Sequence, residues 1–184
     1  MWAGHPVVRG FTHDGPLRRA VGCSGDTPGM PSYYRDRSTP APNRPRLVGV
    51  VALIEFDGSV LVDRRSDDRS WAFPGGRVEE DESVLGALHR EVREEIGLEV
   101  LRADLLGVFS DPTRISEYPD GAVHRTVSVA FVVVPQPGAV PRTSDESLEL
   151  RVFARDDLAA LPLWPAATPI RDAYLAFDGT PVVA

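Results

Sequence analysis

Apolar residues occur along this chain in short blocks with strand-like or helix-like spacing. Residues 47–56, LVGVVALIEF, form a nearly continuous apolar run that is typical of a buried strand. The pair Asp57-Gly58 favours a tight hairpin turn, and SVLVDRR at residues 59–65 supplies its partner strand. Further strands are predicted at residues 101–110, 125–134 and 148–154, and residues 110–124 are expected to form a long loop.

Helical spacing is clearest between Ser83, a suitable N-cap, and Gly97, a suitable stop. Within this segment one apolar stripe is expected to face the core, formed by Leu85, Leu88, Val92 and Ile96. Residues 155–162 and 165–177 predict two more helices. Strands and helices in this mixed order, with hairpins, predict an α/β sandwich of the α+β kind.

The first 46 residues differ from the rest, because they hold seven prolines and six glycines and show no sustained periodicity. We interpret residues 1–46 as an N-terminal arm that precedes a domain at residues 47–184. Whether the arm is flexible or packed stays open. Its aromatic residues offer anchors on the domain or on a partner subunit, as in a homodimer: Trp2, Phe11, Tyr33 and Tyr34.

Composition narrows the functional class. The chain has 184 residues, 42% of them hydrophobic and 26% charged, as in soluble globular proteins. A net charge of −7 does not favour binding to DNA or RNA. The absence of a long apolar run or a secretory signal, together with the single cysteine, Cys23, predicts a cytoplasmic protein that does not enter membranes.

Carboxylates are concentrated in GGRVEEDESVLGALHREVREEIGL, residues 75–98. Glu91, Glu94 and Glu95 have i, i+3 and i+4 spacing, so they are neighbours on a helix and repel one another. A bound divalent cation reverses that effect, because hard ions such as Mg²⁺ take carboxylate oxygens as ligands. The plainer alternative is a solvated charged face paired with Arg90 and Arg93.

This segment resembles the Nudix box, a motif of one glycine, five residues, Glu, seven residues, Arg-Glu, an aliphatic, any residue, Glu-Glu, any residue, Gly and an aliphatic. Every fixed position is present with its spacing intact. The matching residues are Gly76, Glu82, Arg90, Glu91, Val92, Glu94, Glu95, Gly97 and Leu98. The resemblance implies an α/β/α sandwich with a mixed central sheet and a hydrolase that cleaves a nucleoside diphosphate linked to another group, using Mg²⁺ or Mn²⁺.

By this resemblance, Glu91 and Glu95 are the main metal ligands, and Glu94 is a ligand or holds metal-bound water. The carbonyl of Gly76 is a further candidate ligand. Arg90 is expected to orient the carboxylates as a bidentate partner.

The general base is open, since in similar enzymes it is a box glutamate or one from a later loop. Glu146, in a predicted loop before a strand, is the first candidate and Glu149 the second. Glu82 is expected to position the helix or to reach the metal through water.

The group attached to the diphosphate is less defined. The candidate substrate contacts are Arg64, Arg65, Trp71, Arg114 and Tyr118. Pro112 stands about where relatives that cleave ADP-ribose have a proline, which favours ADP-ribose or a related nucleotide sugar. The alternatives are an (oxidised) nucleoside triphosphate and a catalytically inactive nucleotide-sensing module.

Overall fold

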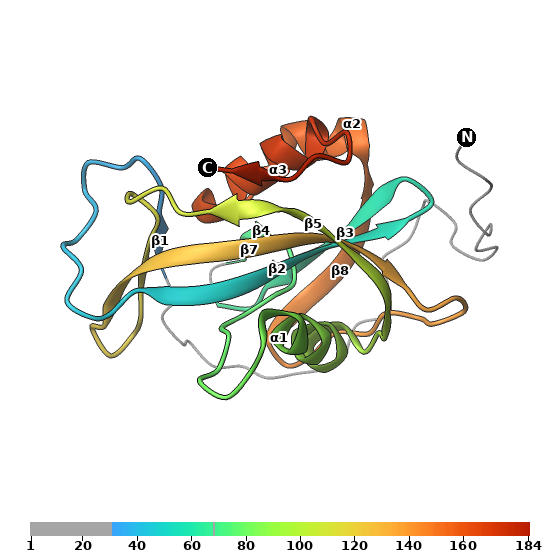
Figure 1. The fold of residues 1–184 in the computed structure, drawn as a ribbon, viewed down its shortest axis with the longest axis horizontal. Helices are drawn as coiled ribbons and strands as arrows, with labels where there is room; N and C mark the ends of the chain where they lie inside the picture. The colour runs from blue at the N-terminus through green and yellow to red at the C-terminus, as the bar shows by residue number, and fades with distance from the viewer. Residues whose placement is uncertain (1–30, 68) are drawn as a thin grey trace.

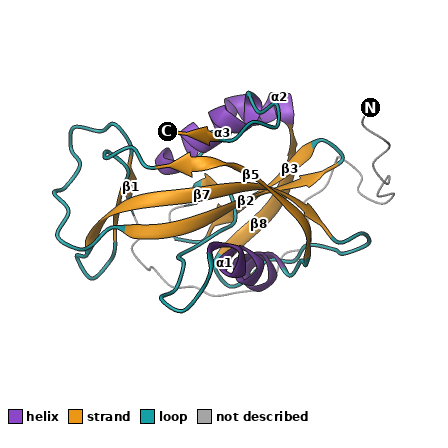
Figure 2. Ribbon diagram, viewed as in Figure 1, coloured by secondary structure: helices purple, strands orange, loops and turns teal. Residues whose placement is uncertain are grey.

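The computed structural model describes residues 31–67 and 69–184, in which helices cover both faces of a β-sheet (Figures 1 and 2). Trp2, Phe11 and Cys23 lie outside this part of the chain. The strands are β1 Ser32–Tyr33, β2 Leu47–Phe56, β3 Ser59–Arg65, β4 Trp71–Ala72, β5 Val100–Phe109, β6 Ile115–Glu117, β7 Val123–Pro135, β8 Ser147–Ala154 and β9 Val182–Val183. The helical segments are α1 Val84–Glu91, η1 Val92–Ile96, α2 Arg155–Ala160, η2 Pro165–Ala167 and α3 Thr168–Leu175.

Strands β2 and β7 form the parallel centre of the sheet, in register from Leu47 opposite Thr126 to Ile54 opposite Val133. Antiparallel neighbours extend the sheet on both sides, with β5 and β6 on β7 and with β3 on the end of β2. Strand β8 pairs with β3 along its length. The sheet is therefore mixed, as predicted.

Two hydrophobic clusters fill the space on either side of this sheet. Alternate side chains of β2, among them Ala52 and Ile54, pack beneath α1 and η1. Leu53, between them, points to the opposite face, where α2 and α3 close the second cluster. Figure 1 shows α1 on one side of the sheet and α2 and α3 on the other. This arrangement confirms the predicted α/β/α sandwich.

Local sequence signals fix several turns. Asp57 and Gly58 both have positive φ, 49° and 80°, as a tight hairpin between two twisted strands requires. The Ser83 side chain accepts a hydrogen bond from the Gly86 backbone N–H at 3.0 Å, so Ser83 caps α1. Gly97 ends the helical segment in the left-handed region, with φ 72°.

The predicted uniform helix was wrong in two respects. The α-helical part ends at Glu91, and residues 92–96 form one wider π-helical turn. Leu85 is 51% exposed, because the core-facing residues of α1 are Ala87 and Leu88. Leu85 lies in the first turn of α1, before the π turn, whereas Leu88, Val92 and Ile96 are fully buried as predicted.

The predicted loop at residues 110–124 was also wrong in part, since it contains β6 and the start of β7. Strand β6 pairs with β7 and, through Ile115 and Ser116, with β1. A strand of three residues is too short to show alternation, so its partners rather than its own pattern define it. Because β1 lies at residues 32–33, part of the Pro-rich segment packs on the sheet.

No helix in residues 31–67 or 69–184 is long and apolar enough to cross a membrane.

Gly97→Ala should destabilise the protein more than Gly138→Ala. Both glycines have positive φ, 72° and 80°, so either alanine costs about 1 kcal/mol of conformational strain. A Cβ at Gly97 would also lie 2.5 Å from Arg142 Nε, whereas one at Gly138 meets no atom within 4 Å. Denaturant unfolding of both variants measures the difference, and equal losses would contradict the collision at Gly97.

Candidate active site

The Gly75–Gly76 turn lies between β2 and the helical segment and touches both. The backbone of this turn is hydrogen-bonded to β2, since the Val50 N–H donates to the Gly76 carbonyl at 2.8 Å. The Gly75 N–H donates to Glu95 Oε2 at 2.9 Å. A Cβ on Gly76 would lie 2.3 Å from Glu91 Oε1, so any other residue here would displace the Glu91 carboxylate. The turn therefore fixes two box carboxylates relative to the sheet.

Arg90 connects the entrance of the helix to the same carboxylates. Its guanidinium forms a bidentate pair with Glu82, with Nε–Oε1 and Nη2–Oε2 distances of 3.0 and 2.9 Å. Arg90 Nη1 donates to Glu91 Oε1 at 2.8 Å and to Glu94 Oε2 at 3.3 Å, and Nη2 donates to the Arg77 carbonyl. The side-chain pair with Glu82 is the main reason that the pKa of Arg90 is raised and the pKa of Glu82 is lowered.

Glu91 is buried and Glu95 is half-buried, whereas the side chain of Glu94 is 60% exposed. Desolvation raises the pKa of Glu91. Desolvation is the main cause that raises the pKa of Glu95 to about 8, with the negative charges of Glu91, Asp63 and Glu146 adding to it and the Gly75 N–H acting against it. The cluster is thus a set of neighbouring carboxyl groups that oppose one another's ionisation.

The donor set fits a hard divalent cation. Carboxylate oxygens are the ligands that Mg²⁺ prefers, and a nearby cation would offset the repulsion described above. Asp63, which is 8% exposed, has an Oδ1 atom that accepts no hydrogen bond from any described residue. The described residues contain no preformed group of three or more His, Cys, Asp or Glu side chains ready to hold an ion. In the present arrangement Arg90 holds Glu91, and the Gly75 N–H holds Glu95.

The structure separates the two later candidates for the general base. Glu146 lies in the loop before β8, and its charge raises the pKa of both Glu91 and Glu95, so it is near the box carboxylates. Glu149 lies on β8, where its carboxylate accepts from Arg151 Nε at 3.0 Å and is 3.8 Å from Arg64 Nη1. Its carboxylate therefore already has two arginine partners.

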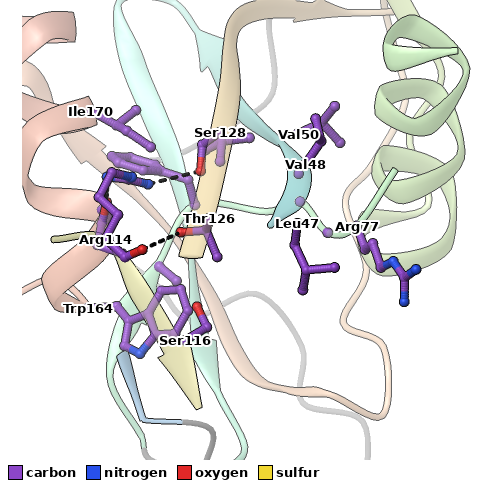
Figure 3. Close-up of a pocket in the computed structure, with 18 of the residues that line it drawn as sticks. Leu47, Val48, Val50, Arg77, Arg114, Ser116, Thr126, Ser128, Trp164 and Ile170 are labelled. Carbon is purple, nitrogen blue, oxygen red and sulfur yellow. Dashed lines mark hydrogen bonds between the residues drawn. The ribbon is translucent and has the colours of Figure 1, made fainter. Parts of the chain in front are cut away.

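A pocket of about 150 Å³ opens beside the first half of β2 and reaches the Gly75–Gly76 turn. In Figure 3, Arg114 and Trp164 lie toward one end of the pocket, and Arg77 lies toward the other, near the box helix. The lining comprises residues 47–51, Ala72, Phe73, residues 75–77, Ser116, Thr126, Ser128, Ala166, Ala167 and Ile170, with Arg65, Arg114, Tyr118 and Trp164.

Three of the five candidate substrate residues, Arg65, Arg114 and Tyr118, line this pocket. Trp71 does not, and its ring makes an edge-to-face contact with Phe153, with centroids 5.4 Å apart.

Arg64 lies outside the pocket, where its Nε donates to the Arg69 carbonyl at 3.4 Å.

Sequence reasoning missed Trp164, Asp63 and Arg77. Trp164 stands directly before Pro165, at the start of the last helical segment, and the Arg65 guanidinium lies 5.0 Å from its ring centroid. Asp63 sits inside an apolar strand block, where a lone acidic residue was the available signal. Arg77 follows the box glycine directly and lines the pocket.

The protein-family model of the NUDIX domain matches residues 43–174 of this sequence. The chain belongs to the Nudix hydrolase family.

Among relatives of this Nudix hydrolase, a MutT-like protein of Streptomyces ambofaciens is 32% identical over 128 residues, which cover 70% of this chain and 75% of that protein. The nucleoside triphosphatase NudI of Escherichia coli is 41% identical over 78 residues, 39% of this chain and only 55% of NudI. The solution structure of the E. coli ORF135 protein superimposes with a TM-score of 0.57 at 30% identity, over 71% of this chain and 89% of that one. Family membership makes the chain an enzyme that acts on nucleoside diphosphate derivatives, and Nudix hydrolases generally use divalent cations.

The metal-free protein should become less stable as pH rises from about 4.5 to about 8, as far as Glu95 contributes. Glu95 has a folded pKa of about 8 against an ordinary value of 4.5. Its neutral form therefore stabilises the fold below about pH 4.5, and that contribution is lost as pH rises through about 8. Denaturant unfolding in EDTA at several pH values measures this slope.

Glu95→Gln should flatten the slope, and the exposed Glu94→Gln is the matched control that keeps it. Excess Mg²⁺ should stabilise the unsubstituted protein more at high pH than at low pH, because the ion competes with the proton. A slope that Glu95→Gln leaves unchanged would contradict the desolvated neutral carboxyl.

Proposed function

We propose that this chain is a Mg²⁺-dependent pyrophosphohydrolase of nucleoside triphosphates, with Mn²⁺ as an alternative ion. The observation that carries the proposal is that one glycine turn contacts both parts of the site. Gly75 and Gly76 touch the carboxylates of Glu95 and Glu91, and the same two glycines line the pocket. A nucleotide in that pocket would bring its phosphates to the carboxylates.

The chemistry of this proposal assigns one task to each box residue. Glu91 and Glu95 would hold the metal, together with Glu94 and the free lone pair of the Gly76 carbonyl. The bound ion would neutralise phosphate oxygens and lower the pKa of a coordinated water molecule. Arg90, fixed by its bidentate pair with Glu82, keeps the Glu91 carboxylate in one orientation.

Glu146 is the proposed proton acceptor for the attacking water. Its proximity to Glu91 and Glu95 favours this role, since the base must lie within reach of a water at the metal. Arg65, which lines the pocket beside Trp164, would contact the substrate.

The choice of triphosphates over ADP-ribose rests on two observations. The relatives include a nucleoside triphosphatase, NudI, whose matched region is 41% identical. The sequence support for ADP-ribose was Pro112, which lies in the turn between β5 and β6 and outside the pocket. ADP-ribose is kept as the second candidate. A cytoplasmic location, a homodimer and an absence of nucleic-acid partners also stay proposals.

A nucleotide panel with Mg²⁺ tests the substrate class. A nucleoside triphosphate should give the monophosphate and pyrophosphate, whereas ADP-ribose would give AMP and ribose phosphate, and chromatography separates these products. Glu95→Gln should lower kcat by about 100-fold or more, because it weakens the metal site. Preferential cleavage of ADP-ribose would overturn the triphosphate assignment, and failure to cleave any nucleotide would overturn the proposed function.

Glu146→Gln and Glu149→Gln form a matched pair for the general base. Glu146→Gln should lower kcat about 100-fold with little change in Mg²⁺ affinity, since general-base catalysis contributes about 10²- to 10⁴-fold. Glu149→Gln should keep near-normal kcat, because its carboxylate pairs with Arg151 and Arg64. The opposite pattern would identify Glu149 as the general base. Near-normal kcat in both variants would indicate that a box glutamate is the general base.

A further inference from the structure

Arg114 is a buried cation that lacks a carboxylate partner among the described residues. Its side chain is 2% exposed, and burial lowers the pKa of its guanidinium. Nη1 donates to the Ala166 carbonyl at 2.7 Å, and Nη2 donates to Ser128 Oγ at 2.9 Å. The Nε–H donates to no described residue. An arginine carries five N–H donors, so this one has hydrogen-bonding capacity that the protein does not use.

The surroundings of this guanidinium belong to the pocket. Arg114 and both of its hydrogen-bond acceptors, Ser128 and Ala166, line the cavity. The neighbouring lining combines the apolar and aromatic side chains of Ile170 and Trp164 with hydroxyl groups, and Figure 3 labels Ser116, Thr126 and Ser128 near Arg114 as well. The apolar and aromatic side chains suit the flat faces of a heterocyclic base, and the hydroxyls can hydrogen-bond to its edge.

We propose that Arg114 is a specificity-determining residue that selects a nucleobase with two adjacent hydrogen-bond acceptors. This inference rests on the proposed function, because it assumes that the pocket holds the base of the nucleotide. With phosphates at the Gly75–Gly76 turn, the base would lie toward the Arg114 end of the cavity.

The acceptor pattern separates the bases. Guanine presents O6 and N7 side by side, the pair that arginine binds in bidentate fashion, whereas adenine presents N7 beside an N6 amino donor. Cytosine likewise offers O2 next to N3, but in uracil the N3–H donor stands between the two carbonyls. The paired N–H donors of the Arg114 guanidinium therefore favour guanine or cytosine and disfavour adenine. Arg65, the other cation at this end, already pairs with Asp67.

The first test is the wild-type enzyme with GTP, CTP, ATP and UTP in the presence of Mg²⁺. We expect kcat/KM for GTP or CTP to exceed that for ATP by about tenfold or more, in line with the discrimination of a bidentate base contact. The GTP and CTP arms tell which of the two acceptor-rich bases fits the cavity. Hydrolysis without base preference, or a preference for ATP, would overturn this inference and leave the proposed function standing. Failure to hydrolyse all four would sink both.

The second test removes the donors with Arg114→Met. The preference for GTP or CTP over ATP should fall to about threefold or less, mainly through KM, with turnover of ATP retained. Arg102→Met, at an exposed arginine paired with Asp104 on β5, is the matched control and should keep the wild-type ratio. An equal loss for all four nucleotides would assign Arg114 to phosphate binding or to packing, and so contradict the proposal.

Ser128→Ala provides a separate test in case Arg114→Met misfolds, which thermal unfolding would reveal. This substitution removes the hydroxyl that accepts the hydrogen bond from Arg114 Nη2 and leaves the guanidinium in place. The base preference should narrow without disappearing, and an unchanged preference would count against the proposed orientation of Arg114.

Discussion

Burial of negative charge against a glycine turn is the constraint on which the rest of the site depends. Glu91 is buried and Glu95 half-buried, and the charge of Glu91 disfavours the ionisation of Glu95. Without a metal they are held by one arginine and one backbone N–H. Such an arrangement has unused capacity for positive charge, and that capacity suits a cation-dependent hydrolase.

The sheet supplies the rigidity that this arrangement needs. The segment from Pro74 to Val78 runs beside β2, with hydrogen bonds from Ala52 N–H to the Pro74 carbonyl, from Val50 N–H to the Gly76 carbonyl and from Val78 N–H to the Val48 carbonyl. The same stretch of β2 forms a wall of the pocket. One strand therefore positions both the carboxylates and the cavity, so a substrate bound in the cavity has a fixed relation to the metal ligands.

In the proposed function, the pocket and the carboxylates would recognise different parts of the nucleotide. In the proposed function, the carboxylate end would serve the phosphate chain of any nucleotide, because a bound cation would take phosphate oxygens whichever base is attached. The Arg114 end holds a buried cation, its two neutral acceptors and a lining of apolar and hydroxyl side chains, which in our proposal would respond to the shape and acceptor pattern of a base. Under this proposal, discrimination among nucleotides would depend on residues outside the box and could change while the hydrolytic chemistry is kept.

The sequence by itself determined the elements whose signals are local and the family to which the chain belongs. The hairpin at Asp57-Gly58, the cap at Ser83, the stop at Gly97 and the spacing of the box carboxylates all depend on neighbours within a few residues. Such signals can be read without knowledge of the fold. The α/β/α sandwich follows from the order of the strand and helix segments along the chain.

Only the tertiary structure decided which distant residues share the site. It brought Glu146 to the box carboxylates, paired Glu149 with arginines, and placed Trp164 and Ser128 at one end of a cavity with Arg114. It also exposed Leu85 and introduced the π turn at residues 92–96. These outcomes depend on strand pairing and on burial between segments far apart in the chain, and neither is encoded in the periodicity of a single segment.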